Sequence, residues 1–101
     1  MGRFGEDLAA WYLTRRGLRV VGRNIRVGGG ELDLLAIDGR ARTVVEVRAT
    51  VGSVDPLDAV DERKRRRVWA LARSVGCDRV DFIGVRVDPE GFDVHWLPGG
   101  G

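Results

Sequence analysis

The strongest constraint on the fold is a pair of apolar segments separated by a short turn, between Gly30 and Thr50. Both segments are rich in β-branched and aliphatic residues, which favour strands. Gly39 follows Asp38 at the turn, and glycine at the first central position supplies the positive φ that a two-residue primed turn requires. The sequence therefore predicts a β-hairpin whose loop is Gly39-Arg40.

This loop fixes which residues face each other along the hairpin. The numbers of facing residues then sum to 79, so Asp33 is expected opposite Glu46. By the same register, Glu31 is expected opposite Arg48. Side chains alternate between the two faces of a strand, so these four charged groups should share one face. Two carboxylates directly opposite each other destabilise a strand pair unless a cation lies between them.

Spacing alone leaves two interpretations of this charged cluster open. In the first, Asp33 and Glu46 hold a divalent metal such as Mg²⁺, which prefers oxygen ligands and is commonly held by one or two carboxylates together with water and substrate phosphate. In the second, Glu31 and Arg48 form a cross-strand ion pair, and the two carboxylates are solvated on an open face.

The spacing from Asp33 to Glu46-Val47-Arg48 resembles the motif of the PD-(D/E)XK nucleases, whose Asp and (Asp/Glu)-x-Lys lie on neighbouring strands. The residues that carry a wider likeness are Gly5-Glu6, Ala9, Leu13, Arg23-Asn24, Gly30–Leu34, Val45–Arg48, Lys64 and Arg79–Asp81. With these residues the chain resembles the YraN-like family of uncharacterised bacterial proteins, which are related to Holliday-junction resolvases. The likeness spans nearly the whole chain.

The resemblance implies a restriction-endonuclease-like α/β fold of order αβββαββ, in which two helices flank a mixed central sheet. The implied activity is metal-dependent cleavage of DNA, with branched DNA such as Holliday junctions as the candidate substrate. Asp33 and Glu46 are the implied ligands of Mg²⁺ or Mn²⁺, and Glu6 is a further ligand. Resolvase-like relatives act as symmetric pairs, because a four-way junction needs two cuts, so a homodimer is also implied.

One part of the motif departs from the family pattern. Arg48 stands where the family has lysine, and Thr50 stands at the usual basic position two residues further on. Arginine supplies charge but does not act as a base at neutral pH, because its pKa exceeds about 12. Lys64, the single lysine among 17 basic residues, is the candidate substitute. The alternative hypothesis is a nuclease-like module that binds DNA or a protein partner without cutting.

The basic residues are unevenly placed, although the formal net charge is only +2. Such clusters are typical of surfaces that contact nucleic-acid phosphates. A run of charge on a helix is also often a solvated face, and both interpretations stay open. The candidate nucleic-acid-binding residues are Arg15, Arg16, Arg23 and Arg26 in a first cluster and Arg63, Arg65, Arg66 and Arg67 in a second.

A first helix is predicted from Arg3 to Arg16, where Gly17 ends it. Glu6 borders a strip of small residues on this helix and is expected to face the acidic cluster. The main apolar stripe is expected to be Phe4, Leu8, Trp11 and Tyr12. A strand is predicted over Leu18–Val27.

A second helix is predicted to begin with Asp55 as its N-cap and to end at Gly76. Lys64 falls on the apolar stripe of this helix and is expected to point toward the sheet. The chain then returns as a final pair of strands over Arg79–Asp88 and Gly91–Leu97.

Composition is that of one globular domain of 101 residues, with 44% hydrophobic and 32% charged residues. Residues 98–101 are expected to form a flexible tail. A single cysteine excludes an intrachain disulfide, and with only one histidine a structural zinc site is not expected. No apolar run approaches the roughly 20 residues that cross a bilayer, and the N-terminus lacks the apolar core of a signal peptide, so the expected location is the cytoplasm.

Overall fold

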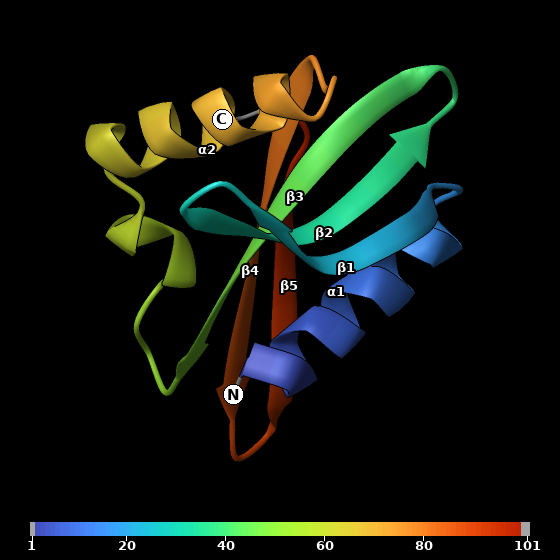
Figure 1. Cartoon of the computed structure of the whole chain (residues 1–101). Coiled ribbons are helices and arrows are strands. Elements are labelled where there is room, and N and C mark those ends of the chain that lie inside the picture. Colours follow the sequence, from blue (N-terminus) through green and yellow to red (C-terminus); the bar gives the residue numbers. More distant parts are fainter. Residues whose placement is uncertain (1, 100–101) are drawn as a thin grey trace.

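Within residues 2–99, which the computed structural model describes, the chain forms five strands, two α-helices and a short 3₁₀ helix. In chain order the elements are α1 (Gly2–Arg15), β1 (Arg19–Val27), β2 (Gly30–Asp38), β3 (Ala41–Val51), η1 (Pro56–Ala59), α2 (Glu62–Ser74), β4 (Arg79–Asp88) and β5 (Gly91–Leu97) (Figure 1). This is the predicted αβββαββ order. None of the described helices is long and apolar enough to cross a membrane.

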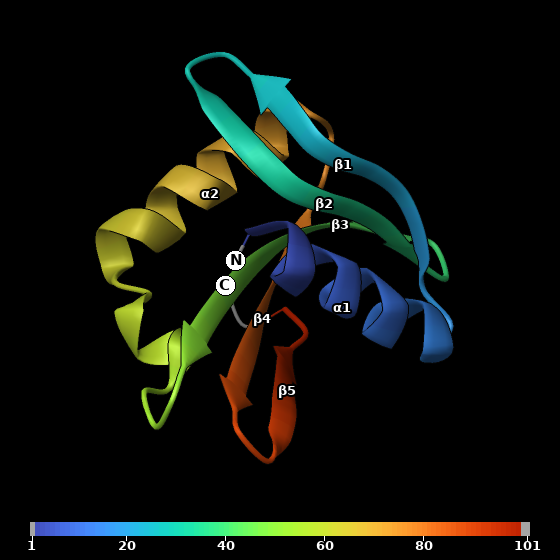
Figure 2. The same ribbon diagram turned by 90° about the horizontal axis from the view of Figure 1, so that it is seen from below.

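The five strands form one mixed sheet in the order β1-β2-β3-β4-β5. Neighbouring strands are antiparallel except for β3 and β4, which are parallel and are connected through α2. A parallel pair needs such a crossover connection. The two helices cover opposite faces of the sheet, with β3 and β4 between them (Figure 2). The predicted mixed sheet flanked by two helices is therefore confirmed.

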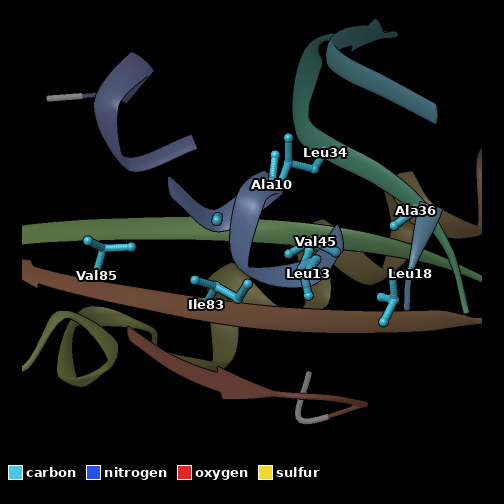
Figure 3. Close-up of a cluster of buried hydrophobic side chains, with 9 residues drawn as sticks. Ala10, Leu13, Leu18, Leu34, Ala36, Val45, Ile83 and Val85 are labelled. Atoms are coloured by element: carbon cyan, nitrogen blue, oxygen red, sulfur yellow. The ribbon is translucent and has the colours of Figure 1, made fainter. Parts of the chain in front are cut away.

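The first helix packs on the sheet through its small residues, which corrects the expected apolar stripe. The buried residues around this contact include Ala9, Ala10, Leu13, Leu18, Leu34, Ala36, Val45, Ile83 and Val85 (Figure 3). Phe4 and Trp11 are instead 49% and 52% exposed. The reason is close approach: a Cβ on Gly5 would lie 3.1 Å from the Cβ of Ala49 in β3. Only the small-residue face lets the helix come this near.

The second helix is interrupted, which corrects the single helix expected from Asp55 to Gly76. Asp55 accepts a hydrogen bond from the N–H of Leu57 at 3.0 Å and caps η1, which ends after one turn. Asp61 then accepts a hydrogen bond from the N–H of Lys64 at 2.8 Å and begins α2. Each aspartate accepts a hydrogen bond from an N–H group that is free at a helix start, so one helix starts at each aspartate.

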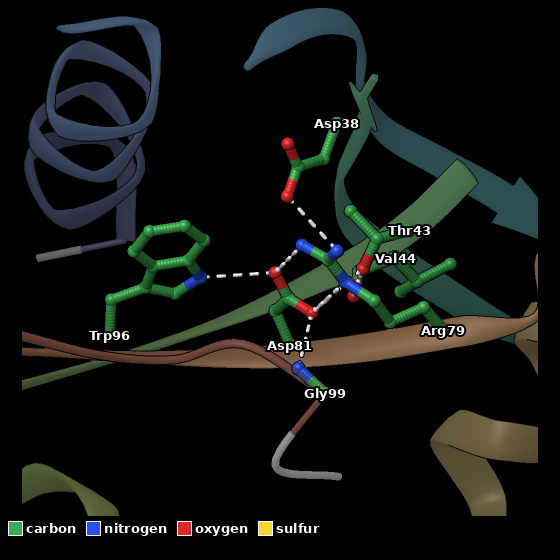
Figure 4. A network of polar contacts seen from close by, with 7 residues as sticks. All are labelled: Asp38, Thr43, Val44, Arg79, Asp81, Trp96 and Gly99. Carbon is green, nitrogen blue, oxygen red and sulfur yellow. Dashed lines mark hydrogen bonds and ion pairs between the residues drawn. The ribbon is translucent and has the colours of Figure 1, made fainter. Parts of the chain in front are cut away.

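A polar network around Asp81 ties the end of the chain to β4 (Figure 4). The Asp81 carboxylate is fully buried. It accepts hydrogen bonds from the side chains of Thr43, Arg79 and Trp96 and from the N–H of Gly99. Burial alone would raise the pKa of Asp81, but the bonds from Arg79, Gly99 and Trp96 outweigh it and hold the pKa below its usual value. Of the tail predicted for residues 98–101, residues 100–101 lie outside the described part.

Candidate functional site

The β2–β3 hairpin has the predicted loop and register along its paired part. The facing pairs are Asp38–Ala41, Ile37–Arg42, Ala36–Thr43, Leu35–Val44 and Leu34–Val45. The ladder ends there, so Asp33 and Glu46 do not form the expected ladder pair. Glu31 does not pair with Arg48 either, because the β2–β3 ladder ends before it. On the other side of β2, Glu31 lies across from Arg26 of β1. The strands separate where the like-charged pair would have formed.

The two carboxylates bind the main chain across this opening instead of facing each other in the ladder. The N–H of Asp33 donates to Oε2 of Glu46 at 3.2 Å, and the N–H of Val47 donates to Oδ2 of Asp33 at 2.8 Å. Two side-chain acceptors therefore take the place of ladder carbonyls. This exchange leaves the second oxygen of each carboxylate, Oδ1 of Asp33 and Oε1 of Glu46, for other partners.

Burial makes both carboxyl groups resist ionisation. Glu46 is only 4% exposed, and burial, followed by the nearby charge of Asp33, raises its pKa to about 7. Burial also raises the pKa of Asp33, against the hydrogen bond from Val47 that lowers it. An opposite charge close to such a pair favours its ionised form. The site is therefore electrostatically suited to a cation.

Lys64 forms an ion pair with this carboxylate pair. Its Nζ lies 3.9 Å from Oε1 of Glu46, on the face of α2 where helical spacing predicts it. The charge of Arg48 lowers the pKa of both carboxyl groups, but less than that of Lys64 does. The buried Nε of Arg48 has no hydrogen-bond partner among the described residues.

Glu6 of α1 is close enough to Asp33 to interact with it electrostatically. Burial and the charge of Asp33 raise the pKa of Glu6, and a hydrogen bond from Asn24 opposes this. Glu6 lines a surface pocket of about 550 Å³ together with Arg3, Asp7, Arg23 and Asn24. Within residues 2–99, no three His, Cys, Asp or Glu side chains are grouped closely enough to hold a metal.

The residues present fit a hexacoordinate Mg²⁺ or Mn²⁺ that keeps part of its water. Such an ion is commonly held by one or two carboxylates, with water and substrate phosphate at the other positions. Oδ1 of Asp33 and Oε1 of Glu46 are the oxygens that the main-chain bonds leave for it. A fully protein-bound cage would need further ligands, which the carboxylate pair alone does not offer.

The predicted nucleic-acid-binding arginines are spread over two regions of the fold. Arg15 and Arg16 stack on Trp11 and Tyr12 at the far end of α1, about 14 Å along the helix from Glu6. Arg23 pairs with Asp7 beside Glu6, Arg26 is exposed on β1, and Arg63, Arg65, Arg66 and Arg67 are on α2. Arg66 pairs with Glu62 at 3.9 Å, and Arg65 lies over the ring of Phe82. Of these arginines, Arg23 lines the same pocket as Glu6, and the α2 cluster shares its helix with Lys64.

Asn24 is the residue beside the site to which sequence reasoning gave no role. Its φ of +51° lies in the left-handed region although it is in the middle of β1. Asparagine tolerates this region better than most residues do. Its residue type is the one available signal, since an apolar and polar alternation along a strand carries no information on φ.

The mixed five-stranded sheet with a helix on each face has a nuclease-like α/β fold. The chain is similar to the structure of Hjc, a Holliday junction resolvase from the archaeal hyperthermophile Archaeoglobus fulgidus. The TM-score is 0.60 at 16% sequence identity, and the match covers 96% of this chain and 76% of that chain. At this identity the likeness shows the fold, which is the predicted restriction-endonuclease-like one.

The chain belongs to the uncharacterised protein family UPF0102, whose model matches residues 5–85. It is 42% identical over 95 residues to a UPF0102 protein of Thermotoga petrophila, covering 87% of this chain and 86% of the relative. It is 43% identical over 102 residues to a UPF0102 protein of Mycobacterium tuberculosis, covering 89% and 80%. The resemblance inferred from the sequence is therefore confirmed.

Proposed function

We propose that this chain is a metal-dependent DNA endonuclease that hydrolyses phosphodiester bonds. The observation that carries the proposal is the pair of carboxylates, Asp33 and Glu46, held by main-chain N–H groups at the opening between β2 and β3 with Lys64 beside them. Branched DNA such as a Holliday junction is the proposed substrate class, supported by the fold that the chain shares with a resolvase.

In this proposal Asp33 and Glu46 hold Mg²⁺ or Mn²⁺ through Oδ1 and Oε1, and Glu6 is a further acidic group near the ion. A divalent ion, when bound, polarises a phosphate oxygen and lowers the pKa of a water. The hydrogen bonds from Asp33 N–H and Val47 N–H fix one oxygen of each carboxylate, so both carboxylates would keep their orientation with or without an ion. Their orientation is thus set before substrate arrives.

Lys64 and Arg48 supply positive charge to the same place. The Lys64 ammonium lies next to Oε1 of Glu46 and can stabilise the negative charge that develops on the phosphate in the transition state. Arg48, on the same strand as Glu46, adds a permanent charge but accepts no proton. Lys64 therefore takes the part that the missing motif lysine would have.

DNA is proposed to lie along the side of the molecule that carries the carboxylates and α2. The basic residues Arg63, Arg66 and Arg67 of α2 are exposed beside Lys64, and Arg23 is exposed beside Glu6. Because a four-way junction needs two cuts, we propose a homodimer as the working form. The expected location is the cytoplasm, where the DNA is.

A binding module that does not cut is the second candidate function. Arg48 in place of the motif lysine favours it, since this position cannot accept a proton. Purified protein incubated with junction, flap, single-stranded and plasmid DNA, in Mg²⁺, Mn²⁺ or EDTA, separates the two functions. Cleavage that needs the metal and is lost in Asp33→Asn supports the nuclease. Binding of DNA with no cleavage of any substrate supports the module.

A further inference from the structure

Asn24 has a backbone conformation that the described part of the chain otherwise reserves for glycine. Its φ is +51°, and the other positions with positive φ in residues 2–99 are all glycines. Glycine adopts such a conformation without steric cost, whereas asparagine only tolerates it. A residue kept in an unfavourable conformation motivates a search for a use of its side chain.

The pairing of β1 with β2 is interrupted at Asn24, directly beside the carboxylate site. β1 pairs with β2 through Arg23–Leu34 and Ile25–Leu32, and the position between these pairs is skipped. That position sets Asn24 across from Asp33. The unusual backbone of Asn24 is therefore adjacent in the sheet to the half-buried carboxylate of Asp33.

The side chain of Asn24 joins this part of the sheet to α1. Its amide lies beside the carboxylate of Glu6 and lowers the pKa of Glu6, because an N–H that faces an ionised carboxylate stabilises it. Both residues line the same pocket of about 550 Å³. The negative charge of Asp33 raises the pKa of Glu6. An amide N–H in this place can hold the acidic side chain of the helix near Asp33.

We propose that Asn24 is a positioning residue that holds the carboxylate of Glu6 toward Asp33 and so provides the third acidic group of the cation site. This inference rests on the proposed function, because it assigns Glu6 to the same metal site. A Mg²⁺ or Mn²⁺ ion at Asp33 and Glu46 keeps several waters. A third carboxylate held nearby can accept hydrogen bonds from these waters.

Asn24 also lies where the inward-facing residues of the β1–β2 hairpin change from one face of the sheet to the other. A purely structural role must therefore be separated from the proposed one. Leu34 packs in the core beneath α1, whereas Leu32, two residues earlier, packs in the core beneath α2. If Asn24 only serves this twist, glycine will replace it without loss. Asn24→Gly keeps the backbone and removes the amide, so it is the discriminating variant.

The contact itself is tested in the metal-free protein by NMR of the Asn24 side-chain amide. Glu6→Ala is expected to shift these two proton resonances. Asp7→Ala removes the neighbouring acidic group, which lines the same pocket and pairs with Arg23, and is the matched control expected to shift them much less. Resonances that do not respond to Glu6→Ala overturn the inference.

The consequence for the cation is tested by calorimetric titration with Mn²⁺ at pH 8. Asn24→Gly is expected to unfold at the same or a higher urea concentration than the unaltered chain, and to bind Mn²⁺ about 3- to 10-fold more weakly, the effect of one ordinary hydrogen bond. Glu6→Gln is expected to weaken binding at least as much. The double variant should bind no more weakly than Glu6→Gln alone, because Asn24 acts through Glu6.

Each result of the titration bears on a stated claim. Unchanged Mn²⁺ affinity in Asn24→Gly, or losses that add in the double variant, overturn the positioning role and leave the metal site intact. Absence of Mn²⁺ binding by the unaltered chain overturns the proposed metal site and this inference together. The NMR experiment needs no metal, so a failure of the contact is distinguished from a failure of the metal site.

Discussion

Replacing Glu46 by glutamine is expected to remove most of the pH dependence of the stability of the metal-free chain between pH 4.5 and 8. The pKa of Glu46 is raised from 4.5 to about 7 in the folded chain. Between these values the folded state binds a proton that the unfolded state has released, so stability falls as pH rises. The stabilisation is complete below about pH 4.5 and is lost as pH passes through 7.

The size of the effect follows from the same pKa difference. A rise of about 2.5 pH units, at about 1.4 kcal/mol for each unit, corresponds to a loss of about 3 kcal/mol by pH 8. The side chain of Glu46 is only 6% exposed, so solvent screens this interaction weakly. Glutamine keeps an oxygen for the N–H of Asp33 and carries no charge. Glu46→Gln should therefore match the unaltered chain at pH 4.5 and exceed its stability by about 3 kcal/mol at pH 8.

Urea unfolding at a series of pH values with EDTA present measures this difference. Glu62→Gln is the matched control, because Glu62 is 69% exposed and forms only a surface pair with Arg66; its curve should run parallel to that of the unaltered chain. Adding Mn²⁺ at pH 8 should stabilise the unaltered chain more than Glu46→Gln. Parallel stability curves for Glu46→Gln and the unaltered chain would refute the reasoning, since the buried carboxylate then costs nothing when it ionises.

Three further changes test the cations and the DNA surface. Lys64→Ala should lower cleavage on the order of 100-fold with nearly unchanged DNA affinity, because the ammonium acts on transition-state charge. Arg40→Ala, at the exposed turn between β2 and β3, is the control in the cleavage assay, and equal rates in the two variants would contradict this role. Arg48→Lys should preserve or raise the cleavage rate. A rate below one tenth of that of the unaltered chain would count against Arg48 as the residue at the motif lysine position. Charge reversal of Arg66 and Arg67 to Glu should weaken binding to all DNA sequences alike. In fluorescence titrations it should reduce the slope of log K against log salt by about 2. An unchanged slope would show that these two arginines do not contact DNA phosphates.

The local sequence pattern was sufficient to predict the order of helices and strands and much of the register of the β2–β3 hairpin. Gly39 at the turn fixed the loop, and the register followed from it as far as the pair of Leu34 with Val45. Helical spacing put Lys64 on the face of α2 that meets Glu46. These positions follow from the two-residue period of a strand and the 3.6-residue period of a helix, which act over a few residues and depend little on the rest of the chain.

Contacts between distant segments decided the remainder, and they follow no local period. The face of α1 that is buried was chosen by how closely the helix approaches β3 at Gly5, so the aromatic Trp11 was left outside. The opening of the hairpin at Asp33 depends on two side-chain to main-chain bonds with β3. The sequence by itself determined which charged residues lie on neighbouring strands and on the helix that packs on them. Only the tertiary structure decided that Glu46 is buried and Asp33 half-buried, because burial and separation of strands depend on what packs against both sides of the sheet.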